Sequence, residues 1–325
     1  MNEVTKFFGI DVSMKTFDVS TSGQKHFQFS NDAEGYRQLM KLLDSECQCV
    51  MEATGSYHQK LATWLSSQGA KVSVVNPLVI KRFAQMRLRL AKTDKADANI
   101  IRQYAEAEKP EVWSPPQGYI TQACEINGLI MLLIRQRTAL KNKLHSVLHK
   151  EGEFSIVLQA LQNQIENLNQ EISKLETSME KLIKEYQGEM LTSLCSIPGI
   201  GKKTAMFLIV LTDAFQSFEN SKQLCAYLGL APTIKMSGKS VRGKSRISKT
   251  GNSVMRNLLF MCSFTACERN KACREQFNRM VDKGKSKKVA LIAVANKLLK
   301  QSLAIAKSGA IYNEEYQSMN PACIH

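Results

Sequence analysis

The first hundred residues alternate between short apolar runs and amphipathic stretches. Residues 4–12 (VTKFFGIDV) form a run that predicts a buried strand. Residues 16–21 and 25–30 predict two further strands, joined by a turn around Gly23. The chain therefore begins with a meander of three strands.

Helices and strands then alternate. Asn31 or Asp32 can cap a helix that runs to about Asp44. The elements expected after it are a strand over 47–52, a helix over about 57–67, a strand over 71–75, and a helix that begins at Pro77. A meander followed by strands separated by helices predicts a mixed α/β layer, in the element order of a ribonuclease H-like fold.

Residues 113–118 (WSPPQG) interrupt this pattern and predict a linker. Beyond it, apolar residues repeat with 3-4 spacing over four heptads, with Glu, Lys, Gln and Asn between them, which is typical of a coiled coil. A weaker repeat precedes it, interrupted by Arg137, and a break at Glu151–Phe154 would let the two helices fold back as a hairpin. The pattern leaves open whether a second chain fills the seam. The strong repeat comprises Leu158, Leu161, Ile165, Leu168, Ile172, Leu175, Met179, Leu182 and Tyr186.

A compact helical domain is expected from about residue 190. Its opening, SIPGIGKKTAMFLI (196–209), places a tight Pro-Gly-Ile-Gly turn between two helices. Such a turn exposes backbone N–H groups at a helix start, where Lys202 and Lys203 add charge, so it suits a DNA phosphate. A helix hairpin that only packs is the alternative. The predicted segments are thus 1–112, 119–187 and 190–325.

Charge narrows the class of partner. The 325 residues carry 44 Lys and Arg against 29 Asp and Glu, a net charge of +15, and 44% are hydrophobic. A folded, basic protein of this kind favours a polyanion such as nucleic acid. A membrane is disfavoured because no apolar run approaches roughly 18 residues and the start lacks a signal-peptide layout. The nine cysteines show no zinc-type spacing and are expected to be reduced, as in the cytoplasm.

Four acidic residues stand out by position. Asp11 follows one apolar strand and Glu52 closes another, so their carboxylates would converge at one edge of the sheet. Asp94 and Asp97 are three apart and share a face on a helix. Clustered carboxylates repel unless divalent cations neutralise them, and oxygen ligands favour Mg²⁺ or Mn²⁺. Two such ions about 4 Å apart can activate a nucleophile and stabilise a leaving oxygen in phosphoryl transfer.

Each acid also has a purely structural interpretation. Asp94 could be a helix N-cap with Asp97 at the third helical position. Asp11 could simply end a strand, and Glu52 could be a solvated loop residue.

A basic tract without acids forms the second candidate site. Between Glu219 and Glu268 there is no Asp or Glu, and residues 232–252 (PTIKMSGKSVRGKSRISKTGN) are too polar for a core strand. The absence of counter-charge predicts a phosphate-binding loop, although a charge run can also be a solvated face. Ser237 precedes Gly238 here, where its hydroxyl could approach a scissile phosphate or merely donate to one. The basic residues expected to bind are Lys235, Lys239, Arg242, Lys244, Arg246 and Lys249.

Two further basic clusters are candidates for holding nucleic acid. One leads directly into Asp94 and comprises Lys81, Arg82, Arg87, Arg89, Lys92 and Lys95. The other precedes the last helix and comprises Lys283, Lys285, Lys287 and Lys288.

An ordered set of short motifs resembles one family along nearly the whole chain. The motifs are GIDVS (9–13), EATGSY (52–57), KTDKADA (92–98), SIPGIG (196–201), LGLAP (228–232) and SGKSVRGKSRISKTGN (237–252). They resemble the Piv/MooV-type transposases, the insertion-sequence one-ten family, whose members include bridge-RNA-guided DNA recombinases. One departure is Met14, where the family more often has Lys.

The resemblance implies an α/β RuvC-like N-terminal domain with a DEDD metal site, matched by Asp11, Glu52, Asp94 and Asp97. A helical coiled-coil connector and a mainly α C-terminal transposase domain with a helix-hairpin-helix-like motif would follow. It implies a catalytic serine, matched by Ser237 although Ser240 and Ser245 lie nearby, that becomes linked to a DNA 5′ phosphate.

Implied partners are donor and target DNA, a structured guide RNA, and further copies of the chain in a dimer or tetramer that pairs one subunit's acids with another's serine. A hydrolytic junction resolvase and a non-catalytic nucleic-acid scaffold are the alternatives. A sugar-kinase-like ATPase is disfavoured because a second Gly-rich phosphate loop is missing.

Overall fold

The computed structural model describes residues 6–53, 55–88, 94–233, 236–237, 241–242, 246–248 and 251–315. Six basic residues of the predicted sites and clusters lie outside these ranges: Arg89, Lys92, Lys235, Lys239, Lys244 and Lys249. The two serines near Ser237, Ser240 and Ser245, also lie outside them. The chain divides into two compact units, one up to Pro116 and one from Gln117. Each is described by itself below.

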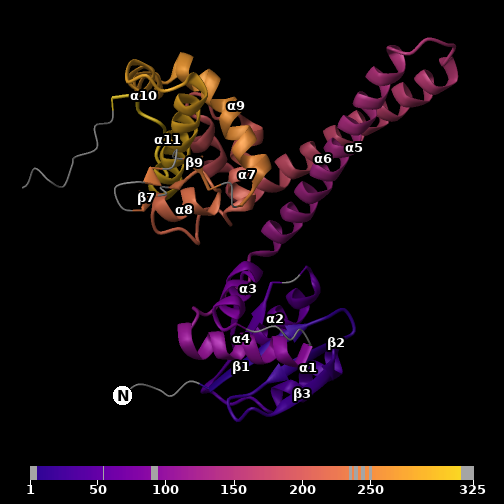
Figure 1. Cartoon of the computed structure of the whole chain (residues 1–325), viewed down its shortest axis with the longest axis vertical. Helices are drawn as coiled ribbons and strands as arrows, with labels where there is room; N and C mark the ends of the chain where they lie inside the picture. The colour runs from indigo at the N-terminus through magenta and orange to yellow at the C-terminus, as the bar shows by residue number, and fades with distance from the viewer. Residues whose placement is uncertain are drawn as a thin grey trace, which may run out of the picture. The chain divides into compact units, whose positions relative to one another are not determined.

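The first unit is built on a mixed five-stranded sheet in the order β3-β2-β1-β4-β5 (Figure 1). The strands β1 (Lys6–Val12), β2 (Thr16–Ser20) and β3 (His26–Ser30) form the antiparallel meander. Strands β4 (Cys47–Glu52) and β5 (Lys71–Val75) continue the sheet in parallel with β1. The predicted strands are confirmed to within two residues at each end.

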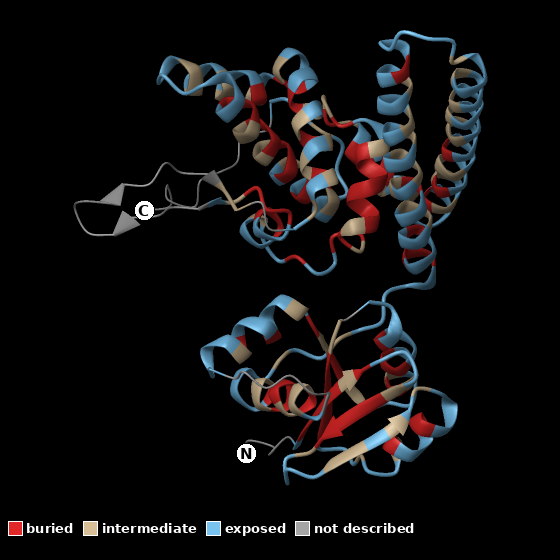
Figure 2. Ribbon diagram, turned by 45° about the vertical axis from the view of Figure 1, so that its right-hand side comes forward, coloured by how far each residue is buried: buried red, intermediate tan, exposed pale blue. Residues whose placement is uncertain are grey.

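Helices cover both faces of this sheet. The helices α1 (Ala33–Met40) and α2 (Tyr57–Ser67) pack on the face that carries Ile10 and Met51. The helices α3 (Pro77–Met86) and α4 (Asp94–Glu108) pack on the opposite face, which carries Phe7 and Val50. Buried residues concentrate in the central strands in Figure 2, so the unit is a three-layer α/β structure.

The helix predicted to reach about Asp44 ends earlier, at Met40. Its start is confirmed, since the Asp32 side chain accepts hydrogen bonds from the backbone of Glu34 and Gly35. The chain beyond Met40 turns toward β4 because the Asp44 carboxylate accepts from the Glu46 N–H at 3.0 Å. This local hydrogen bond competes with continuation of the helix.

The second unit opens with two long helices, α5 (Gly118–Leu148) and α6 (Ser155–Cys195), which run antiparallel and pack against each other (Figure 1). Within this chain, α5 packs against the apolar seam of α6, where Ile172 and Met179 are buried. Arg137, which interrupts the repeat in α5, donates to the Asn169 side chain of α6 at 2.9 Å. The interruption therefore gives a polar contact across the helix pair.

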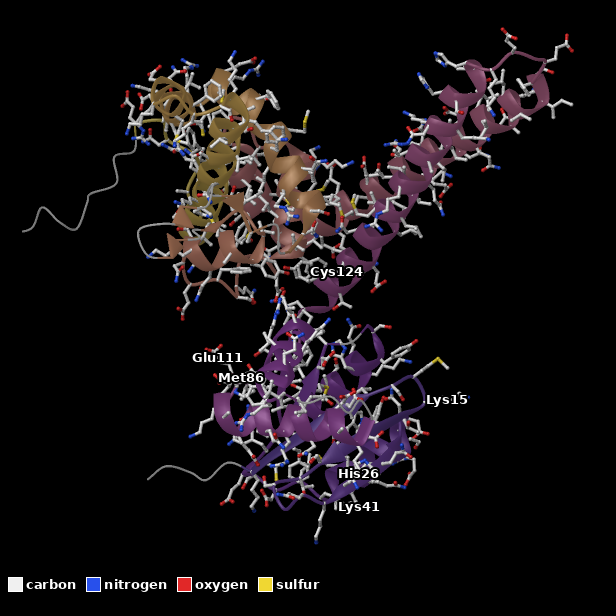
Figure 3. All side chains as sticks on the ribbon, viewed as in Figure 1. Lys15, His26, Lys41, Met86, Glu111 and Cys124 are labelled. Carbon is white, nitrogen blue, oxygen red and sulfur yellow. The ribbon has the colours of Figure 1, made fainter. Side chains whose placement is uncertain are left out.

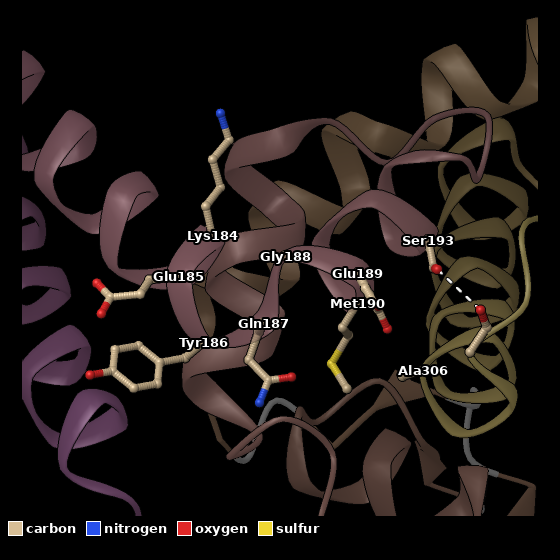
Figure 4. Close-up of a pocket in the computed structure, with 10 residues that line it drawn as sticks. Lys184, Glu185, Tyr186, Gln187, Gly188, Glu189, Met190, Ser193 and Ala306 are labelled. Atoms are coloured by element: carbon tan, nitrogen blue, oxygen red, sulfur yellow. Dashed lines mark hydrogen bonds between the residues drawn. The ribbon is translucent and has the colours of Figure 1, made fainter.

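The α6 helix is kinked at Gln187, whose side chain donates to the Tyr119 hydroxyl at 2.7 Å. A cavity of about 480 Å³ lies at this kink, lined by residues from Lys184 to Met190 and by Ser193 (Figure 4). None of the predicted site residues lines it.

The remaining helices form the core of the second unit. They are α7 (Lys202–Leu211), α8 (Ser221–Tyr227), α9 (Ser253–Arg269), α10 (Lys271–Asp282) and α11 (Lys287–Ser308). Four two-residue strands lie between α8 and α9: β6 (Pro232–Thr233), β7 (Met236–Ser237), β8 (Val241–Arg242) and β9 (Arg246–Ile247). Among the described residues, α11 alone is long and apolar enough to cross a membrane by length and composition, and half of that stretch is buried in this helical core.

Candidate active site and nucleic-acid interface

The sheet register brings Asp11 and Glu52 to one edge. In the parallel pair of β1 and β4, Ile10 lies opposite Met51, so Asp11 and Glu52 are the next residues on neighbouring strands. Neighbouring strands lie about 4.8 Å apart, and paired residues point to the same face. Both acids are partly buried and occupy the face covered by α3 and α4. The predicted convergence at a sheet edge is therefore found in the backbone.

The helix α4 approaches the same edge through an unusually close contact with β1. A Cβ placed on Gly9 would lie 2.2 Å from the Ala98 carbonyl oxygen and 2.3 Å from the Arg102 nitrogen. Asp11 lies about 6.6 Å beyond Gly9 along the strand. The first turn of α4, which carries Asp94 and Asp97, directly precedes Ala98, the residue that contacts Gly9.

Buried polar contacts fix α4 in this position. Arg102 is 5% exposed, and its Nε donates to the Ser20 hydroxyl of β2 at 3.2 Å. Its guanidinium also donates to Asn99 at 2.8 Å and pairs with Glu106 on the same helix. Because every side of this buried cation has a partner, displacement of α4 would leave a charge without its hydrogen bonds, which is costly.

The acids offer a donor set that suits a hard divalent cation, because carboxylate oxygens are the ligands preferred by Mg²⁺. Asp11, Glu52 and Asp97 are each only partly buried. Each of the three also has an interaction within the chain. Among described side chains, no three His, Cys, Asp or Glu are gathered closely enough to hold a metal; the Asp94 side chain lies outside that set.

Sequence reasoning missed a fifth acid on this face. Asp18 of β2 lies opposite Asp11 and is only 4% exposed. Its carboxylate accepts from Gln28 at 3.2 Å and lies 2.6 Å from the His26 ring nitrogen, on β3 (Figure 3). The alternation of residues 16–20 is the sequence signal for the position of Asp18. Its neighbours Phe17 and Val19 point into the core on one face of the sheet, so Asp18 points to the opposite face, which carries Asp11.

Met14, the departure from the family pattern, lies in the turn between β1 and β2. It is 61% exposed, and the neighbouring Lys15 is also exposed (Figure 3). The first basic cluster is only partly described. Arg87 lies with its guanidinium 5.3 Å from the centre of the Phe83 ring, and Lys81, Arg82 and Lys95 are exposed.

The Pro-Gly-Ile-Gly turn is present between α6 and α7, and Gly199 has a positive φ of 107°. A Cβ at Gly199 would lie 2.7 Å from the Ala266 Cβ, so the turn packs tightly on α9.

Lys202 and Lys203 begin α7, as expected, but both form ion pairs with α6. Lys202 lies 2.9 Å from Glu180 and Lys203 contacts Glu176. Lys184 also pairs with Glu180, at 2.7 Å, and these lysines lower the pKa of that carboxyl. A DNA phosphate at this turn would have to compete with both glutamates.

The tract around Ser237 forms two short strand pairs where the sequence indicated a loop. Ser237 of β7 lies opposite Val241 of β8, and Thr233 of β6 lies opposite Arg246 of β9. For Asp94, Ser237, Arg242 and Arg246 the structure describes the backbone. Strands of two residues are compatible with the polar composition because they need no buried face.

Family models match both units of the chain. One, described as "Transposase", matches residues 8–151, and another, described as "Transposase IS116/IS110/IS902 family", matches residues 191–278. The first match contains Asp11, Glu52, Asp94 and Asp97, and the second contains Ser237 and the basic tract.

The chain is also similar to known proteins over most of its length. It is 32% identical over 324 residues to the pilin gene-inverting protein of Moraxella lacunata, covering 95% of this chain and 98% of that protein. The pilin gene-inverting protein of Moraxella bovis gives 32% identity over 321 residues. The transposase for insertion sequence element IS1111A of Coxiella burnetii is 24% identical over 287 residues, which cover 78% of this chain and 76% of that protein.

Proposed function

This chain belongs to the IS116/IS110/IS902 transposase family, whose members recombine DNA, and we propose that it cleaves and exchanges DNA strands with four carboxylates and one serine. The carboxylates are those of Asp11, Glu52, Asp94 and Asp97, and the nucleophile is Ser237. The proposal is supported by the register that makes Asp11 and Glu52 neighbours at the ends of β1 and β4, and by the close contact of α4 with Gly9 of β1. We further assign this unit to the RuvC-like fold, which the strand order and the helical covering of both faces support.

The four acids would hold Mg²⁺, with Mn²⁺ as a substitute. The bound ions supply charge stabilisation for a phosphodiester under attack and for the oxygen that leaves. Asp11 and Glu52 would hold the ion at the sheet edge, and Asp97 would join them from the first turn of α4, which packs on β1 at Gly9.

Ser237 attacks the phosphorus of a DNA phosphodiester. The Ser Oγ–P bond forms, the P–O3′ bond breaks, the serine proton leaves, and the 3′ oxygen departs as a hydroxyl after taking up a proton. The DNA 5′ phosphate is then linked to the protein. Attack by the 3′ hydroxyl of another strand reverses this step, so strands are exchanged without net hydrolysis. Lys202, Lys203 and the basic residues of 232–252 contact the phosphate backbone.

The covalent step separates this proposal from its alternatives. Wild-type protein with Mg²⁺ and supercoiled substrate should give a protein–DNA adduct that survives denaturation, and Ser237→Ala should give none. Cleavage by the wild type without any adduct would indicate a hydrolytic resolvase instead. If Asp11→Asn and Glu52→Gln recombine DNA like the wild type, the acids are only structural and the protein is a scaffold.

The acids and the serine lie on different compact units, so they can come from different subunits of a dimer or tetramer. Mixing inactive Asp11→Asn protein with inactive Ser237→Ala protein tests this. A composite site restores part of the activity because some pairs combine intact acids with an intact serine. No recovery, with mixed oligomers demonstrated, would place both groups in one subunit.

The resemblance to guided recombinases supports two further proposals. A structured RNA guides the choice of donor and target DNA, and the protein acts in the cytoplasm at the nucleoid. Sequencing of the RNA that copurifies with the protein tests the first. A single structured species from the non-coding end of the element would support guidance, and recombination by RNA-free protein at full rate would contradict it.

A further inference from the structure

The corner between α10 and α11 concentrates positive charge. Residues 269–288 contain eight Lys and Arg and two acidic residues, a net charge of +6 within twenty residues. Lys283, Lys285, Lys287 and Lys288 are all exposed, and so is Arg279. Figure 1 shows α10 and α8 at different ends of the helical core, and the basic tract around Ser237 begins just after α8.

Among the described residues the corner lysines have no acidic partner, in contrast to four lysines on or near α6. Lys174, Lys184, Lys202 and Lys203 each pair with a glutamate of α6. Within the described ranges, none of the four corner lysines lies within 4.0 Å of a carboxylate oxygen. Their charge is therefore available to a ligand without displacement of an internal ion pair.

A closed turn holds these lysines in place. Gly284, with a φ of 74°, donates its N–H to the Val281 carbonyl at 2.8 Å, and the Lys285 N–H donates to Met280 at 3.0 Å. The Gln276 side chain donates to the Ala293 carbonyl at 3.1 Å and ties α10 to α11. These hydrogen bonds fix the backbone of the turn that carries the corner lysines.

Helix stability does not account for this charge. Lys287 and Lys288 lie in the first turn of α11, which contains no acidic residue. Cations there oppose the helix dipole, whereas acidic residues would stabilise the turn. A placement that costs stability and lacks internal compensation indicates a functional constraint.

We propose that the α10–α11 corner binds the phosphodiester backbone of a nucleic acid, at a site separate from the basic tract around Ser237. Four neighbouring lysines with no aromatic residue among them suit phosphates rather than bases, so binding is independent of sequence. The backbone can belong to the recombining DNA or to a structured RNA, since both present the same chemistry. This site does not require the acids or Ser237 to be catalytic.

The test compares two variants with the same loss of charge. Lys285→Gln, Lys287→Gln, Lys288→Gln removes three corner lysines, and Lys174→Gln, Lys181→Gln, Lys184→Gln removes three exposed lysines of α6. Binding of full-length protein to duplex DNA, duplex RNA and single-stranded RNA is measured against salt concentration in EDTA, where no cleavage occurs.

Each phosphate contact contributes about 0.9 to the slope of log affinity against log salt on duplex DNA and about 0.7 on single strands. The corner variant should lose about two to three units of slope on at least one probe, and the α6 variant should lose less than one. Loss on DNA alone identifies the substrate backbone, and loss on RNA alone identifies a structured RNA.

Replacement of the same three corner lysines by Arg should retain the wild-type slope, which separates charge from folding. If the corner variant matches the α6 variant on all three probes, the proposed site does not exist. Because catalysis is not measured, failure of the serine mechanism would leave this result unaffected.

Discussion

Gly9 provides the sharpest test of the α4 position. In Gly9→Ala the new methyl group would meet three backbone atoms, at 2.2 Å from the Ala98 oxygen, 2.3 Å from the Arg102 nitrogen and 2.8 Å from the Arg102 Cα. Ordinary contact begins near 3.4 Å. Backbone atoms cannot rotate away, so α4 must move by at least about 1 Å, and Asp97 in its first turn moves with it.

The displacement should affect catalysis far more than folding. Overpacking by one methyl group lowers the free energy of unfolding by about 1–3 kcal/mol, whereas the free energy of unfolding of a domain is about 5–15 kcal/mol. Nearly all of the protein therefore stays folded. A displacement of about 1 Å at a catalytic group costs roughly 100-fold in rate. We expect Gly9→Ala to lose about 100-fold in strand cleavage while it unfolds cooperatively in urea.

The control is Gly23→Ala in the same unit, where the nearest heavy atom to the added Cβ is the Thr21 hydroxyl at 3.9 Å. This variant should cleave like the wild type. Cleavage rates are measured on supercoiled substrate at saturating Mg²⁺, and free energies of unfolding come from urea titration. If Gly9→Ala cleaves within twofold of the wild type, close seating of α4 does not set the geometry of the acids.

Three further outcomes are expected. Gly199→Ala should destabilise the protein by roughly 1–3 kcal/mol in urea, because φ is 107° and the Cβ would lie 2.7 Å from that of Ala266; an unchanged midpoint would contradict the tight turn. Burial raises the pKa of Asp213, so the folded state binds this proton more tightly and loses stability as pH rises through the folded pKa. Asp213→Asn should therefore raise Tm near pH 7, and the gain should vanish near pH 3, where a persistent gain would point to another cause. Glu176→Gln with Glu180→Gln should tighten DNA binding several-fold if the lysines at the start of α7 contact phosphate, and equal affinity would place those lysines outside the interface.

Local patterns in the sequence predicted most of the first unit. The strands ending at Val12 and Glu52 follow from apolar runs, and the Asp32 cap follows from residue type. The end of α1 at Met40 was not predictable from periodicity, because the competing hydrogen bond involves the side chain of Asp44, four residues further along.

Non-local contacts account for what the sequence did not reveal. The pairing of Lys202 with Glu180 joins residues 22 apart, and a charge pattern along the chain cannot identify such a partner. Asp18 was missed because an acid within a short strand is normally exposed. Strand alternation indicates which face Asp18 occupies, but its burial depends on β3, which brings Gln28 and His26 against it.

The acids of the proposed cation site depend on two different kinds of interaction. Asp11 and Glu52 are fixed by the hydrogen-bonded register of β1 and β4, in which a slip by one residue would move the shifted strand's apolar side chains to the wrong face. Asp97 depends instead on how closely one helix packs on one glycine. A packing distance changes at a lower energetic cost than a strand register. Substitutions at the contact between α4 and β1 should therefore alter the proposed cation site with a smaller loss of stability than substitutions that disturb the strand pairing. The position of α4 is therefore the adjustable element of this site.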